Sequence, residues 1–226
     1  MSSDKIIQSL SRDLQPVRRL RGVEWRTLLW GGFALLCVSI GTYVLGARPD
    51  LSLKIRDPAY LCESVLLVLI FVFSARSAFH LSVPGAERNA GARMLPLLGL
   101  LLWACLIAIG HSDHSPSRAA DSMGGWPCVW RMTGLALAPA LAVLFMLRRA
   151  APLSPGWTGW FALLSACSLA ILGTQTLCGN DDPRHLFLWH FCPVLAAGLV
   201  GIHLGRWLLT RARVRAGNDA DPDHQS

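Results

Sequence analysis

The chain has 226 residues, of which 53% are apolar and only 15% are charged, whereas a soluble globular domain is about 25% charged. A chain this apolar would expose too much hydrocarbon to stay monomeric in water. Composition therefore excludes a disordered chain, a collagen and an ordinary soluble enzyme, and it favours a membrane protein with several spans. The formal net charge is +7, and the seven cysteines are too many by one to be fully paired as disulfides.

Residues 1–26 are polar, carry no cleavable signal peptide, and predict a short amphipathic helix that ends before Pro16. Its apolar residues recur at helical spacing, and they are Ile6, Ile7, Leu10 and Leu14. A helix this short is marginal alone in water. Two interpretations stay open. Either the apolar face docks in a groove on a partner protein, or the helix lies on the inner leaflet, held by Arg18, Arg19 and Arg21.

Six stretches are long and apolar enough to cross a membrane as helices, which takes about 20 residues each. They are Thr27–Ala47, Leu61–Val83, Met94–His111, Pro127–Leu147, Trp157–Leu177 and Phe187–Leu209. The sequence therefore predicts an all-α, polytopic membrane protein, a six-transmembrane-helix bundle with short loops over residues 27–209. The segment 1–26 precedes it, and a basic, then disordered tail (210–226) follows.

The two tails and every second loop between the spans carry most of the lysine and arginine. The positive-inside rule therefore places these segments, and with them both termini, in the cytoplasm. The first outer loop departs from this rule, because it carries Arg48, Lys54 and Arg56.

Six tryptophans fall near the predicted span ends, and we expect them at the membrane interfaces, which indole rings favour. They are Trp25, Trp30, Trp126, Trp157, Trp160 and Trp207. In the last span, Gly201 and Gly205 form a GxxxG pattern. Such a pattern either marks a close helix–helix contact or arises by chance.

Candidate chemistry gathers at the outer ends of the spans, where Cys128 begins the fourth and Cys178 ends the fifth. These spans form a hairpin whose inner turn lies midway between the two cysteines, so equal rises of about 1.5 Å per residue place both thiols at similar height. In an oxidising compartment they could form a disulfide, and as reduced thiols they could bind a thiophilic metal ion. Candidate additional ligands are His111, His114, Asp181 and His185. We expect the other five cysteines to be apolar filler.

These thiols suit either a regulatory sensor or a quinone-linked membrane thiol oxidoreductase, which would use them catalytically. The missing CxxC pair and the unexplained N-terminal helix disfavour the oxidoreductase. A metal transporter is disfavoured too, because Glu63, Arg76 and Arg131 lie at different depths in the spans and form no polar path.

Several phrases, in their order and spacing, resemble those of one family of bacterial proteins. They are Ile6–Leu20 in the N-terminal segment, Leu45–Leu51 and Asp57–Leu61 in the first outer loop, Ala78–Gly85 after the second span, Leu147–Pro155 between the fourth and fifth spans, and Cys178, Asp181, Asp182, Trp189 and His190 in the passage to the sixth. In these phrases the chain is similar to the NrsF family, which are six-helix anti-sigma factors of the inner membrane.

The resemblance implies a multi-pass protein of the bacterial inner membrane that is not an enzyme and requires no cofactor. Its cytoplasmic N-terminal segment would hold an extracytoplasmic-function sigma factor away from RNA polymerase, with no direct nucleic-acid contact, until stress releases it. The partner-binding residues would be Ile6, Ile7, Leu10, Leu14, Val17, Arg18 and Arg19. The family's outer cysteine pair maps onto Cys128 and Cys178, so we expect these thiols to sense a thiophilic metal ion or an oxidant. The lipid bilayer is the other partner, and a homo-oligomer stays open.

Overall fold

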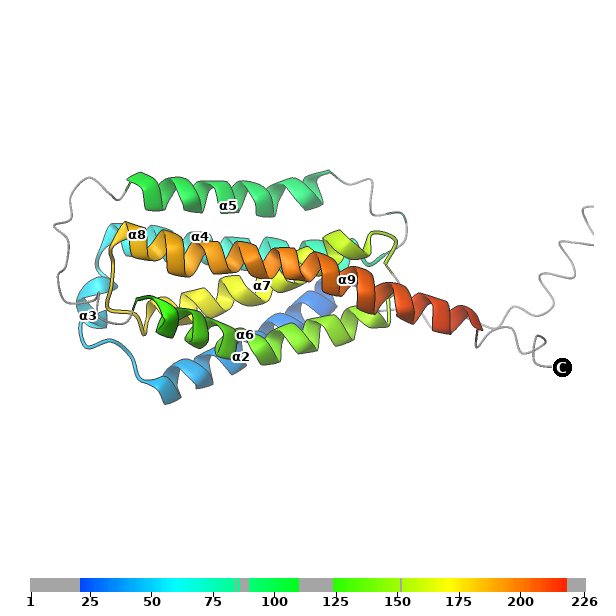
Figure 1. Ribbon diagram of the computed structural model, residues 1–226, viewed down its shortest axis with the longest axis horizontal. Helices are drawn as coiled ribbons and strands as arrows, with labels where there is room; N and C mark the ends of the chain where they lie inside the picture. Colours follow the sequence, from blue (N-terminus) through cyan, green and yellow to red (C-terminus); the bar gives the residue numbers. More distant parts are fainter. Residues whose placement is uncertain (1–20, 84, 86–89, 110–123, 151, 219–226) are drawn as a thin grey trace, which may run out of the picture.

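The computed structural model describes residues 21–83, 85, 90–109, 124–150 and 152–218, with side chains as far as residue 210. Within these ranges the chain is helical and contains no strand (Figure 1). Its elements are α2 (Val23–Leu45), α3 (Leu51–Lys54), α4 (Pro58–His80), α5 (Gly91–Ile109), α6 (Trp126–Arg148), α7 (Pro155–Gln175), α8 (Pro183–Leu186), the π-helix η3 (Phe187–Phe191) and α9 (Cys192–Asn218).

In the described residues, six helical segments are long and apolar enough to cross a membrane, which confirms the predicted all-α bundle. They are α2, α4, α5, α6, α7 and the continuous run Pro183–Thr210. Several begin earlier than predicted, because hydropathy marks only the apolar part of a helix whereas capping fixes its start. The Asp57 carboxylate accepts a hydrogen bond from the Ala59 amide before α4, and a proline follows the aspartate at the first helical position. Asp182 and Pro183 start α8 in the same way.

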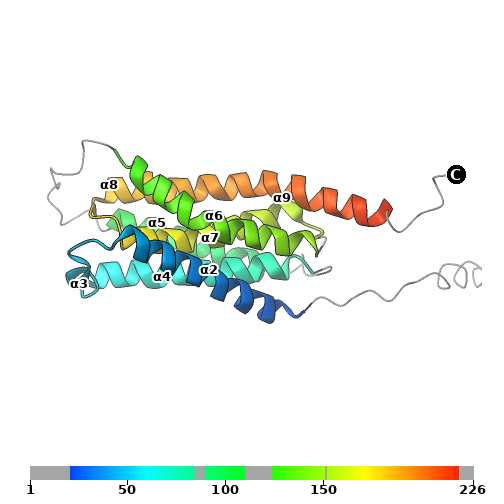
Figure 2. The same ribbon diagram turned by 90° about the horizontal axis from the view of Figure 1, so that it is seen from below.

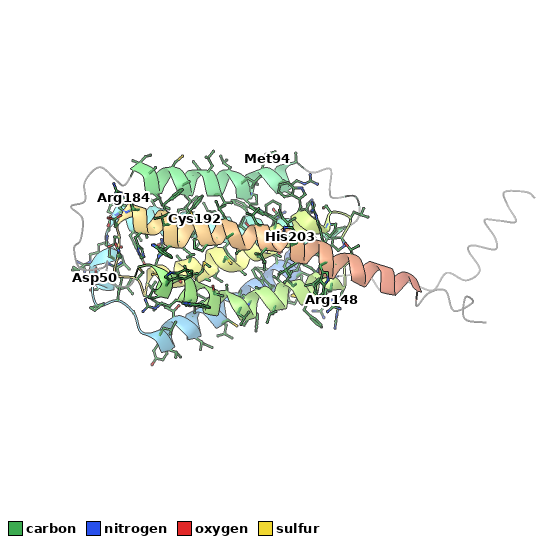
Figure 3. All side chains as sticks on the ribbon, in the orientation of Figure 1. Asp50, Met94, Arg148, Arg184, Cys192 and His203 are labelled. Atoms are coloured by element: carbon green, nitrogen blue, oxygen red, sulfur yellow. The ribbon has the colours of Figure 1, made fainter. Side chains whose placement is uncertain are left out.

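The bundle has two ends, which Figures 1 and 2 show from two directions. α2 begins and α9 ends at one of them, which we name the terminal end. The other, which we name the cysteine end, holds α3, α8 and the segments 46–57 and 176–183. Asp50 and Arg184 mark the cysteine end in Figure 3, and Arg148 lies toward the terminal end.

α7 is the central helix. It contacts α2, α4, α6 and α9, and most of its residues are buried. The buried hydroxyl groups of Ser165, Ser168 and Thr174 donate hydrogen bonds to α7 carbonyl oxygens three or four residues earlier. Because these polar groups are satisfied within the helix, α7 can lie in the interior without a polar partner on another helix.

α7 and α9 approach each other backbone to backbone, and their contact is the most extensive in the bundle. A Cβ atom on Gly159 would overlap the Gly201 carbonyl oxygen, and one on Gly205 would overlap the Pro155 carbonyl oxygen. The GxxxG pattern therefore does mark a helix–helix contact, in which glycines permit the close approach.

α2 has the smallest buried share of the six spans. The position of its Trp30 differs from the predicted one. Trp30 was expected at a membrane interface but is 1% exposed. Its indole N–H donates to the Pro139 carbonyl oxygen of α6 at 3.0 Å, and its ring contacts Phe71 and Phe79 of α4. The side chain thus fills the junction of three helices, where its one donor finds an acceptor. Three other tryptophans are exposed near helix starts, and they are Trp25, Trp126 and Trp157.

Candidate functional site

Cys128 and Cys178 face each other at the cysteine end, with their Sγ atoms 3.4 Å apart. Both are buried free thiols. Cys128 lies in the first turn of α6, and Cys178 follows the last residue of α7 by three positions. The sequence predicts that the two thiols lie at similar height, because both helices rise equally from the turn between them. The structure adds the rotation of each helix, which points the two thiols toward each other. The Cys128 thiol donates a hydrogen bond to Cys178, which lowers the pKa of Cys178.

His185, one of the predicted candidate ligands, completes a triangle with the two thiols. Its Nε2 atom lies 3.5 Å from each Sγ atom. The single turn α8 positions this ring. Asp182 fixes the start of that turn by accepting a hydrogen bond from the Arg184 amide at 2.7 Å.

His190 also reaches the thiols, although sequence analysis does not include it among the ligands. Donor atoms of Cys128, Cys178, His185 and His190 all lie within 4.8 Å of one another. In an α-helix with 3.6 residues per turn, side chains five residues apart point to different faces. The π-helix η3 widens the turn, and the Cys192 amide donates to the Phe187 carbonyl oxygen five residues earlier. This wider turn brings the two histidine rings to 5.4 Å between centroids.

Trp189 holds η3 against the start of α6. Its ring lies on Gly125, where any Cβ atom would overlap the indole, and it contacts Trp126 with 5.6 Å between ring centroids. Because Cys128 lies only three residues after Gly125, this contact brings His190 and Cys128 into the same cluster.

Arg48 ties the segment after α2 to the segment that carries Cys178. The residue is 6% exposed, and its guanidinium donates to the Cys178 carbonyl oxygen at 2.7 Å and to the carboxylates of Asp181 and Asp50 at 2.8 and 2.6 Å. The bonds with Asp50 and Asp181 raise the pKa of Arg48, and the bond from Arg48 lowers the pKa of Asp50. Arg48, which departs from the positive-inside rule, is therefore a cross-link between two segments beside the thiols.

Asp181, a predicted candidate ligand, is held by cations instead. Its carboxylate pairs with Arg48 and, at 3.1 Å, with Lys54, and it is not among the residues whose donor atoms gather at the thiols. The remaining predicted positions lie outside the described residues. They are the candidate ligands His111 and His114 and the partner-binding residues Ile6, Ile7, Leu10, Leu14, Val17, Arg18 and Arg19.

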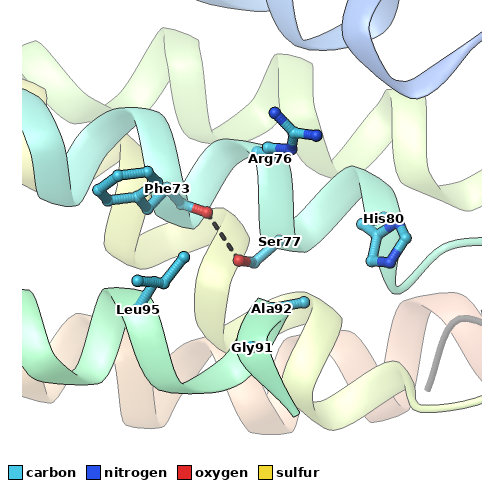
Figure 4. Close-up of a pocket in the computed structure, with 7 residues that line it drawn as sticks. All are labelled: Phe73, Arg76, Ser77, His80, Gly91, Ala92 and Leu95. Carbon is cyan, nitrogen blue, oxygen red and sulfur yellow. Dashed lines mark hydrogen bonds between the residues drawn. The ribbon is translucent and has the colours of Figure 1, made fainter. Parts of the chain in front are cut away.

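Away from the thiols, a cavity of about 300 Å³ lies between α4 and α5 toward the terminal end. Figure 4 shows its lining, in which the Ser77 hydroxyl donates to the Phe73 carbonyl oxygen at 2.7 Å. Arg76 also lines it and pairs with Glu24 of α2 at 2.8 Å. Glu63, by contrast, accepts a hydrogen bond from the Trp103 indole at 2.8 Å. These two charged residues of α4 thus have separate partners.

Comparisons with known proteins agree on one family. A family model described as "NrsF: Negative regulator of sigma F" matches residues 10–210, which include the thiols, both histidines and the six spans. The chain belongs to the NrsF family. The curated Anti-sigma-F factor NrsF of Caulobacter vibrioides (strain NA1000 / CB15N) is 33% identical over 227 aligned residues, which cover 92% of this chain and 99% of that protein. No solved structure matches the chain significantly. Membership of the NrsF family indicates an anti-sigma factor, so the partner of the chain is a sigma factor.

Proposed function

We propose that this NrsF protein lies in the bacterial inner membrane with both termini in the cytoplasm. Its N-terminal segment sequesters an extracytoplasmic-function sigma factor until Cys128 and Cys178 sense a metal ion or an oxidant. One observation carries this proposal: the two thiols meet at the end of the bundle opposite to the start of α2. A chain that enters from the cytoplasm therefore presents its thiols to the outer compartment.

The charges of the described residues support this orientation. Two of the three cations that depart from the positive-inside rule are neutralised, since Arg48 pairs with Asp50 and Asp181, and Lys54 pairs with Asp57 at 3.0 Å and with Asp181. Toward the terminal end, Arg148 and Arg149 are exposed at the end of α6, where anionic lipid would attract them.

The free energy required for release is within reach of such a site. Moving a sigma factor from almost fully bound to almost fully free takes about 5.5 kcal/mol of differential affinity. Zinc bound by thiolates and imidazoles in zinc-finger peptides contributes about 10–16 kcal/mol at neutral pH. An ion held by these ligands could therefore drive release with part of its binding energy.

The docking segment is tested by capture of a sigma factor from solubilised membranes. The full chain should retain the sigma factor, and a chain lacking residues 1–24 should not. Leu10→Asp places a charge on the predicted apolar face and should also abolish capture, whereas Gln8→Asp on the polar face is the matched control and should not. Equal capture by all four proteins would contradict docking through this segment.

The sensing role is tested in cells with a reporter gene that depends on the captured sigma factor. Replacement of both Cys128 and Cys178 by serine should abolish induction by cadmium or an oxidant while repression persists. The control replaces Cys62 and Cys105, which are exposed and outside the thiol cluster, and it should respond normally. Induction of the Cys128 and Cys178 double variant at the level of the unchanged protein would refute sensing by these thiols.

A further inference from the structure

His190 is the unexplained member of the thiol cluster. It is fully buried, with 0% exposed, and within the described part of the chain neither ring nitrogen has a hydrogen-bond partner. Burying an imidazole without a partner opposes folding. One ring nitrogen of His190 lies within 4.8 Å of two sulfurs and a second imidazole, which is the position of a metal ligand.

The spacing of the donor atoms matches a tetrahedral site. With Zn–S bonds of about 2.3 Å and Zn–N bonds of about 2.0–2.1 Å, tetrahedral angles put two sulfur ligands about 3.8 Å apart and a sulfur and a nitrogen about 3.5 Å apart. The two Sγ atoms are 3.4 Å apart, and each lies 3.5 Å from His185 Nε2. Three ligands are therefore close to the required geometry, and a nitrogen of His190 lies within 4.8 Å of each of them.

The charges of these ligands also suit a buried divalent ion. Two thiolates and two neutral imidazoles around a divalent cation form a site with no net charge, which limits the cost of burial. Thiolate and imidazole ligands in tetrahedral geometry select zinc and similar thiophilic ions over magnesium and calcium, which prefer oxygen ligands.

We propose that Cys128, Cys178, His185 and His190 form a closed four-ligand site for one thiophilic divalent ion of the zinc or cadmium type. Four protein ligands leave no position for a substrate, which is the arrangement of structural rather than catalytic zinc sites. The proposal deepens the proposed function, because it names the chemical class of the signal. The binding of the ion itself does not depend on the sigma factor.

A small polar cavity adjoins the site. It holds about 20 Å³ and is lined by Cys178, Glu63, Gln175 and His190, among others. That volume accommodates one water molecule, and neither amide atom of Gln175 has a partner in the described residues. Metal-bound histidines usually donate their second ring N–H to a carboxylate, a carbonyl or water. A water molecule in this cavity would be such a partner for His190, and Glu63, which lines the same cavity, would position the ring through it.

The test titrates the purified full-length protein, reduced and in detergent, with Co²⁺ and then displaces Co²⁺ with Zn²⁺ or Cd²⁺. One Co²⁺ per chain should bind with the intense visible absorption of a tetrahedral site that contains thiolates. His190→Asn and His185→Ala should each weaken binding by more than about 100-fold, since loss of an outer-shell partner alone costs about 10–100-fold. The control His203→Ala removes an exposed imidazole on α9, far from the site (Figure 3), and should bind normally.

The outcomes separate this inference from the proposed function. Normal Co²⁺ affinity in both histidine variants, or no binding by the unchanged protein, would overturn the four-ligand site, whereas the anti-sigma function would fail only if the sigma factor is not captured. If His190→Asn does not fold, as judged by gel filtration and thermal unfolding, His185→Ala decides alone, because His185 is only partly buried.

Discussion

Replacement of Arg48 by leucine should loosen the segment that carries Cys178. The substitution removes the hydrogen bond to the Cys178 carbonyl oxygen and both ion pairs of the guanidinium. The buried bond to the carbonyl dominates the loss, since the Asp50 and Asp181 side chains are 48% and 34% exposed and Asp181 still pairs with Lys54. A buried hydrogen bond from a charged group contributes about 1.5–3 kcal/mol. We therefore expect local opening of residues 176–182 to become easier by about 2 kcal/mol.

This change can be read from the reactivity of the thiols. A free-energy change of about 1.4 kcal/mol is tenfold in an equilibrium, so about 2 kcal/mol raises the open population, and with it the rate of maleimide labelling, by about 30-fold. The measurement uses a protein in which the five cysteines other than Cys128 and Cys178 are replaced by alanine. Arg56→Leu is the matched control, because Arg56 is exposed on the same segment and should leave the rate unchanged. Labelling of Arg48→Leu at the unchanged rate would refute the assignment of Arg48 as a cross-link.

Two further predictions concern the helix contacts and the surroundings of His190. Gly159→Ala forces α7 and α9 apart and should lower the free energy of unfolding by about 1–3 kcal/mol, as overpacking does. The control Gly134→Ala on α6 has nothing within 4 Å of the new Cβ atom and should leave the free energy of unfolding unchanged. Thermal unfolding in detergent compares the two variants, and equal midpoint temperatures would contradict the close contact of α7 and α9. Glu63→Gln keeps all four ligands but removes the carboxylate that lines the cavity next to His190. The affinity for Co²⁺ should therefore fall about tenfold, with an unchanged absorption spectrum. Unchanged affinity would show that the carboxylate does not position the His190 ring.

The features that the sequence predicts correctly depend on distance along one helix axis. Hydropathy over about 20 residues finds the six spans, and equal rises from one turn place Cys128 and Cys178 at similar height. Both arguments need only the length of a helix. His185 follows Cys178 by seven residues in the same connection, which makes it a candidate ligand, but its position 3.5 Å from both sulfurs depends on how the chain turns into α8.

The features that the sequence misses depend on rotation and on partners from distant segments. His190 joins the thiols only because η3 departs from 3.6 residues per turn, and no periodicity argument based on α-helices can place it. Trp30 was assigned by its closeness to a span end, but the choice between interface and interior depends on what α4 and α6 present to it. Arg48 and Asp181 are 133 positions apart, and counting basic residues shows nothing of the pair that they form.

α2 joins the two ends of the molecule as a single rod. Its 23 residues run without a break from Val23, just after the proposed docking segment, to Leu45, three residues before Arg48. At about 1.5 Å per residue this rod is about 34 Å long, close to the thickness of the hydrocarbon core. It also has the smallest buried share of the six spans, with Arg26, Trp30, Ala34 and Val38 as its buried residues. Because α2 is one continuous helix with little buried surface, and Arg48 links its C-terminal end to the segment that carries Cys178, a small displacement beside the thiols would move the whole helix. The displacement would reach the opposite membrane surface without unfolding any helix.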